Sequence, residues 1–174
     1  MSHIVILGIG NILFCDEGFG VRVIEKMNDL YEFPENVRLV DGGVLGMNLL
    51  GLMSEADHLI VIDAVRNGSP AGTLIRLAGT EIPARVRAKN SLHQVDFLEA
   101  LTLCQALDNI PQTIILGIEP QDIDSLKTEL SPLIEKQIDP MIARVLREVS
   151  ALGGSFKKRS IVHVSGHTIQ DCGN

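Results

Sequence analysis

The 174-residue chain has few aromatic residues and no tryptophan, and this scarcity limits how its core can be built. Phe and Tyr together make up 3% of the residues. Hydrophobic residues nevertheless reach 45%, so the core must consist of aliphatic side chains and methionine. A chain of this length buries about two thirds of the surface that its unfolded form exposes, which suffices for one domain. Such a core suits a sheet covered by helices.

Other absences exclude whole classes of protein. No apolar run approaches the roughly 18 residues that span a bilayer, and the first residues show no signal-peptide pattern. Cys15, Cys104 and Cys172 are odd in number and far apart, so we expect reduced thiols and neither a disulfide framework nor a CxxC metal site. These features predict a cytoplasmic protein. The net charge of -7 provides no broad basic face, which argues against nucleic acid as a partner.

Several catalytic motifs are also missing. The chain contains no GxxxxGK[ST], HExxH or GxSxG segment, so nothing in it favours a P-loop protein, a zincin or a serine hydrolase. Residues 8–13 begin like a dinucleotide-binding fingerprint, but Leu13 stands where its third glycine should be, which disfavours NAD binding. Cys15 is a poor nucleophile candidate, because the neighbouring Asp16 and Glu17 disfavour its thiolate.

What the chain does contain is an alternation of apolar runs with helical patterns. Four runs predict buried strands, at His3–Gly8, Val37–Asp41, Leu59–Asp63 and Thr113–Ile118. Apolar spacing predicts helices through Val23–Leu30, Met47–Met53 and Phe97–Cys104. An additional strand, which could be antiparallel, is expected at Thr73–Leu77. The alternation predicts an α/β fold: a single-domain three-layer sandwich, with a mostly parallel twisted sheet and helices on both faces.

The C-terminal part combines one more helix with a segment that lacks periodicity. Ser131 followed by Pro132 predicts a helix start, with a capping residue and a proline in the first turn. Pro140 should kink this helix or split it in two. We assign residues 1–152 to one α/β domain and residues 153–174 to a C-terminal tail that we expect to be mobile.

Acidic residues follow three of the predicted strands. Asp16 and Glu17 come after the first strand, Asp41 after the second and Asp63 after the third. Because the carboxyl ends of parallel strands share one edge, we expect these acids to converge where such folds bind ligands. His93 lies in a connection that could reach the same edge. Two carboxylates and one imidazole would suit a borderline divalent ion such as nickel or zinc, with a coordination position left open.

Each of these residues also has a structural explanation. Asp16 or Glu17 could stabilise the N-terminus of the following helix, which favours negative charge. Asp41, which precedes two glycines, could shape a turn. Asp63 could end a strand, and His93 could pack or start a helix. Their joint placement at one edge is what favours a functional site.

The sequence of residues 8–21, GIGNILFCDEGFGV, closely resembles the GxGNxLxxDEGxG opening of the hydrogenase maturation protease family. Further matching segments bring the resemblance to roughly residues 4–149; they lie at 41–43, 58–64, 91–94 and 116–120. The resemblance implies a central sheet between helices, and a site in which Glu17, Asp63 and His93 bind nickel carried by the substrate. Cys15 departs from the small or hydroxylic residue expected there, and the last residues match nothing in the family.

The resemblance implies an endopeptidase that removes the C-terminal extension of a nickel-loaded [NiFe] hydrogenase large-subunit precursor. The nickel would be the recognition mark, so the enzyme would bring no cofactor of its own, although another divalent metal could occupy the isolated site. Asp41 is a candidate base or orienting group for the attacking water. The expected partner is the precursor, with neither nucleic acid nor a membrane involved.

Two alternatives remain open at this point. The same three ligands could belong to a nickel-binding chaperone that docks on the precursor without cutting it. A hydrolase of similar fold, such as peptidyl-tRNA hydrolase, shares the GxGN opening, but Asp16, Glu17 and the negative net charge make a tRNA substrate awkward. Loss of the C-terminal extension on incubation would distinguish the protease from the chaperone.

Overall fold

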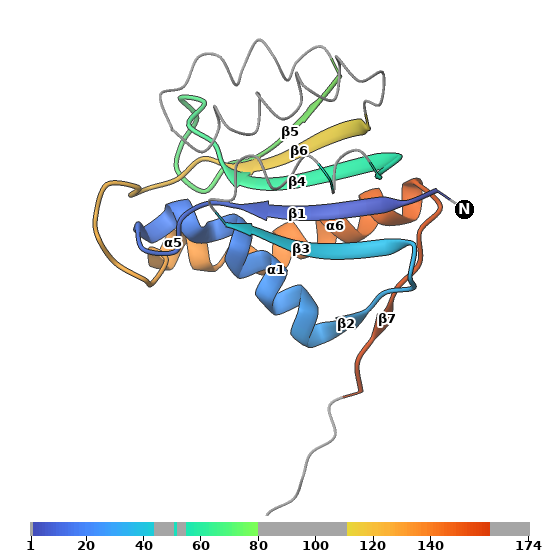
Figure 1. The fold of residues 1–174 in the computed structure, drawn as a ribbon. Coiled ribbons are helices and arrows are strands. Elements are labelled where there is room, and N and C mark those ends of the chain that lie inside the picture. Colours follow the sequence, from blue (N-terminus) through green and yellow to red (C-terminus); the bar gives the residue numbers. More distant parts are fainter. Residues whose placement is uncertain (1, 44–50, 52–54, 80–110, 161–174) are drawn as a thin grey trace, which may run out of the picture.

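A computed structural model describes residues 2–43, 51, 55–79 and 111–160 (Figure 1). Its main sheet has five strands in the order β3-β1-β4-β6-β5. Four strands run parallel: β1 (Ile4–Ile9), β3 (Val37–Gly43), β4 (His58–Ala64) and β6 (Gln112–Ile118). The fifth, β5 (Leu74–Ala78), pairs antiparallel with β6. The mostly parallel α/β sheet predicted from the sequence is confirmed, and the additional strand is indeed antiparallel.

The central strands β1 and β4 are buried almost throughout, which explains their continuous apolar runs. Successive side chains alternate between two core clusters on opposite faces of the sheet. Ile6 and Ile60 belong to one cluster, whereas Leu7 and Val61 belong to the other. Apolar side chains are therefore buried on both faces of the sheet.

Helices α1 (Phe19–Leu30) and α6 (Ile138–Ala151) pack on the same core cluster and cover one face of the sheet (Figure 1). Their buried positions recur with helical spacing, as at Val23 and Met27 in α1 and at Met141 and Val145 in α6. The helices predicted through Met47–Met53 and Phe97–Cys104 lie outside the described residues, apart from Gly51. Within the described ranges, no helix is long and apolar enough to cross a membrane.

The helix predicted from Ser131 onward is split in two, as the sequence analysis allowed. The first part, α5 (Pro132–Glu135), is a short helix, and α6 begins three residues later. Pro140 is the third residue of α6, where a backbone N–H has no partner within the helix. The proline therefore sits in the first turn of α6 and does not kink it.

Residues 153–160 differ from the mobile tail that we expected to begin there, because they pair and pack with the domain. Strand β7 (Lys157–Lys158) pairs antiparallel with β2 (Tyr31–Glu32), which directly follows α1. Phe156 packs against Tyr31 and Phe33, with ring centroids 5.8 Å and 6.3 Å apart. Strands of two residues are too short for a periodic pattern, so the sequence analysis missed them. Residues 161–174 lie outside the described residues, and for them the tail stays a prediction.

Candidate functional site

The structure places Asp41, Asp63 and Glu17 at the same edge of the sheet, where the parallel strands end. Asp41 lies opposite Gly8 of β1, and Gly8 lies opposite Ile62, the residue before Asp63. The two aspartates therefore flank the end of β1. Glu17 belongs to the short 3-10 helix η1 (Cys15–Gly18), which follows β1 in the chain and contacts β4.

Two glycines allow η1 and α1 to approach this edge closely. A Cβ atom at Gly20, in the first turn of α1, would overlap the carbonyl oxygen of Ile62 and lie 2.5 Å from that of Ile9. Gly10 has a φ of +133°, and a Cβ atom there would overlap the carbonyl oxygen of Glu17. Backbone therefore meets backbone at both positions, which a side chain would prevent. The glycines of the opening motif hold the Glu17 backbone against the end of β1.

The side chains of Glu17, Asp41 and Asp63 differ in exposure. The Asp63 side chain is buried, Glu17 is half-buried and Asp41 is exposed. Asp41 Oδ1 accepts a hydrogen bond of 2.9 Å from the backbone N–H of Gly43, which has a φ of +41°, so this side chain helps to fix the backbone at the end of β3. His93 lies outside the described residues. Among the residues that are described, no three His, Cys, Asp or Glu side chains form a cluster able to hold a metal ion.

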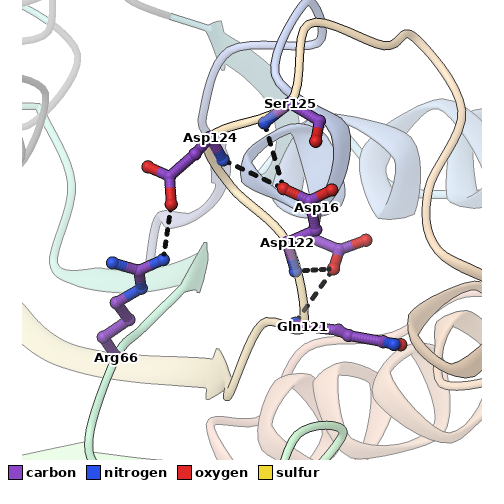
Figure 2. Close-up of polar contacts among 6 residues, drawn as sticks. All are labelled: Asp16, Arg66, Gln121, Asp122, Asp124 and Ser125. Carbon is purple, nitrogen blue, oxygen red and sulfur yellow. Dashed lines mark hydrogen bonds and ion pairs between the residues drawn. The ribbon is translucent and has the colours of Figure 1, made fainter.

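Asp16 is fully buried and fixes a distant segment of the chain (Figure 2). Its Oδ2 accepts hydrogen bonds from the backbone N–H groups of Gln121 and Asp122, at 2.9 Å and 2.8 Å. The backbone N–H and the hydroxyl of Ser131 donate to Asp16 at 2.7 Å and 2.9 Å. No hydrogen bond of the Asp16 carboxylate caps η1 or α1. Asp16 anchors the connection between β6 and α5 to η1.

Cys15 is buried beside this anchor and has an unusual backbone conformation, with a φ of +44°. Burial raises the pKa of its thiol, and the negative charges of Asp16 and Asp122 raise the pKa further. The thiol therefore stays protonated near neutral pH. This agrees with the interpretation that Cys15 is not a nucleophile.

Glu119 is another buried carboxylate at this edge, and the sequence analysis did not select it as a site residue. It directly follows β6, and its Oε2 accepts hydrogen bonds from the backbone N–H groups of Asn67 and Ser69, at 2.6 Å and 3.2 Å. Glu119 thereby fixes the connection between β4 and β5. The signal that selected Asp63, an acid at the end of an apolar strand, was also present here and could have identified it.

The connection between β6 and α5 is further ordered by its own acids (Figure 2). Asp122 Oδ1 accepts hydrogen bonds from the backbone N–H groups of Asp124 and Ser125, at 3.1 Å and 3.0 Å. The bonds from Ser125 are the main reason that the pKa of Asp122 is lowered. Asp124 also pairs with Arg66 at 3.2 Å, which links this connection to the one after β4.

Comparison with known proteins assigns this arrangement to a family. A family model described as hydrogenase maturation protease matches residues 21–148. The chain is 41% identical over 163 residues to the hydrogenase expression/formation protein HupD of Rhodobacter capsulatus, covering 92% of this chain and 78% of that protein. It is 35% identical over 163 residues to the hydrogenase 2 maturation protease of Escherichia coli strain K12, covering 92% and 99%.

The fold leads to the same family. The structure matches that of the hydrogenase maturating endopeptidase HybD from E. coli with a TM-score of 0.86 and 34% sequence identity. The match covers 90% of this chain and 98% of that chain. On sequence and on fold, this chain belongs to the hydrogenase maturation protease family and is a peptide-bond hydrolase that acts in hydrogenase maturation.

Proposed function

We propose that this protein is an endopeptidase that removes the C-terminal extension of a nickel-loaded [NiFe] hydrogenase large-subunit precursor. One observation carries the proposal: in a member of a protease family, Glu17 and Asp63 come from separate segments that lie at the same edge of the sheet, the edge where such folds bind ligands. The reaction takes place in the cytoplasm, a compartment consistent with the buried free thiol of Cys15.

The precursor's nickel is the recognition mark in this proposal. The carboxylates of Glu17 and Asp63, completed by the imidazole of His93, form a mixed oxygen and nitrogen ligand set that suits nickel. Three protein ligands leave coordination positions for the precursor's own ligands. Because an empty precursor cannot supply the coordination energy, cleavage depends on nickel insertion, and the enzyme brings no cofactor of its own.

Asp41 is the proposed base or orienting group for the water that attacks the scissile carbonyl. Its carboxylate is exposed at the edge and is oriented by the bond from Gly43 to Oδ1. As the water oxygen bonds to the carbonyl carbon, Asp41 accepts a water proton; the C–N bond then breaks and the leaving amine takes up a proton.

The experiment that tests this function compares nickel-loaded with nickel-free cognate precursor and reads the precursor mass. We expect loss of a short C-terminal peptide from the loaded precursor only. Glu17→Gln and His93→Ala should lower the cleavage rate by about tenfold or more, because each removes a proposed nickel ligand. Glu25→Gln is the matched control for Glu17→Gln. It makes the same substitution in α1, where Glu25 forms an exposed surface ion pair with Arg22.

Asp41→Asn separates recognition from cleavage in the same assay. This variant should bind the loaded precursor as tightly as the wild type does and should cut it about tenfold or more slowly. Normal processing by this variant would remove the role of Asp41. Binding of the loaded precursor without any mass change, by the wild-type protein, would instead favour the nickel-binding chaperone.

A further inference from the structure

Three large hydrophobic side chains are exposed among the described residues, and two of them lie in segments that are hydrogen-bonded to each other next to η1. The three are Leu13 at 52% exposure, Leu126 at 75% and Leu133 at 42%. A single exposed leucine is ordinary on a protein surface. Here Leu13 lies between β1 and η1, Leu126 lies between β6 and α5, and Leu133 lies in α5 beside Gly72 of the connection between β4 and β5.

Leu13 and Leu126 stand on two segments that are bonded to each other. The backbone N–H of Lys127 donates to the carbonyl oxygen of Leu13 at 3.0 Å. The backbone N–H of Cys15 donates to the carbonyl oxygen of Lys127 at 2.7 Å, and Phe14 and Lys127 form a parallel β-bridge. The two leucines therefore belong to one surface, which we call the two-leucine surface.

The two-leucine surface is held in a fixed position relative to Glu17. The buried Asp16 carboxylate, directly before Glu17, accepts hydrogen bonds from Gln121, Asp122 and Ser131 on either side of Leu126. The backbone N–H of Asp16 also donates to the Asp122 carbonyl oxygen at 2.9 Å. A surface fixed before binding loses little conformational entropy when a partner covers it.

We propose that the two-leucine surface docks an extended segment of the precursor polypeptide, through apolar side chains near its scissile bond. The inference rests on the proposed function, because it takes the precursor as the partner. Its grounds are the exposed apolar side chains, their rigid backbone and their continuity with the edge that carries Glu17. The surface binds polypeptide and not metal, so it supplies affinity for loaded and empty precursor alike, while the nickel ligands distinguish the two.

The test substitutes Leu13→Ser and Leu126→Ser, singly and together, with Leu133→Ser as the matched control. Each of the first two changes should raise KM for loaded precursor about tenfold and leave kcat unchanged, the size expected when a leucine is lost from a small interface. The double variant should also bind nickel-free precursor more weakly than the wild type does, by at least the factor expected for each single variant in KM. Leu133→Ser should change KM by about twofold or less, since Leu133 lies outside the two bonded segments.

The outcomes separate this inference from the proposed function. Suppose that the wild type cleaves loaded precursor and that the double variant has an unchanged KM, with or without a lower kcat. The docking inference is then overturned and the proposed function stands. If the wild type fails to cleave, the function fails, and binding of precursor by wild type and double variant still decides the docking inference. The single variant Leu126→Ser controls for misfolding. Because this side chain is 75% exposed, the variant should unfold at the same temperature as the wild type.

Discussion

Asp16 and Glu17 are neighbours with the same charge and different tasks. Asp16 is fully buried and accepts backbone hydrogen bonds from residues more than 100 positions away, whereas Glu17 is half-buried at the edge of the sheet. Sequence reasoning singled out this acidic pair as site candidates. It could not tell which acid is the anchor, because the donors at Gln121 and Ser131 are brought close only by the fold.

Asp16→Asn should destabilise the protein by about 2–4 kcal/mol. The amide group replaces one acceptor oxygen with a donor that faces other donors, so at least one buried N–H or O–H loses its partner. Urea denaturation followed by circular dichroism measures the change. Asp124→Asn is the control and should change the unfolding free energy by about 0.5 kcal/mol or less, because the pair with Arg66 is exposed. Equal destabilisation by both variants would show that Asp16 is not an anchor.

At the scale of elements, the opening motif acts through its glycines as well as its acids. The packing of η1 and α1 against β1 and β4 requires backbone contacts at Gly10 and Gly20. From the sequence, these glycines resembled an incomplete dinucleotide fingerprint. The structure gives them another reason, since they bring Glu17 to the strand ends.

Gly20→Ala should destabilise the protein by about 2–4 kcal/mol, because its methyl group would overlap backbone oxygens that cannot rotate away. Gly51→Ala is the matched control: its Cβ would meet no atom within 4 Å, and alanine favours the helical conformation of this residue. Denaturation of both variants in guanidinium chloride measures the difference. A Gly20→Ala variant as stable as Gly51→Ala would contradict the close approach of α1 to β4.

The elements also show where pattern reasoning succeeds and where it stops. β1, β4 and β6 were predicted to within one residue at each end, because short continuous apolar runs bounded by turn residues are typical of buried strands. β2 and β7 carry too few residues for a pattern, and they form because Phe156 packs beside Tyr31. Their pairing joins residues more than 120 positions apart, which local propensity cannot reveal.

For the whole molecule, topology explains how much of the site could be predicted. Asp41 and Asp63 were placed together by one rule, that parallel strands end at one edge, and the register of β3, β1 and β4 bears out their placement. The same rule says nothing about the two-leucine surface, which depends on the anchoring of the long connection between β6 and α5. Local patterns predicted where the strands end, and only the folded structure shows that the connection between β6 and α5 packs against η1 at that edge.

The extent of the folded domain gives the last prediction. A chain that ends at Ser160 keeps β7, Phe156 and the 2.8 Å bond from the Gly154 N–H to the Val149 carbonyl oxygen. It should melt within about 2 °C of the full chain, because it keeps every helix and strand of the described domain. A chain that ends at Leu152 loses those contacts and leaves aromatic rings of the β2 region uncovered.

The shorter chain should therefore melt about 5–10 °C below the full chain, which corresponds to a loss of roughly 2–3 kcal/mol for a domain of this size. Thermal unfolding followed by circular dichroism measures the shift. Phe156→Ala in the full chain is the comparison variant. It should reproduce much of the fall in melting temperature, because Phe156 contacts both Tyr31 and Phe33. Equal melting of the two shortened chains would place the end of the stabilising structure at residue 152, because residues 153–160 would then contribute no measurable free energy to folding.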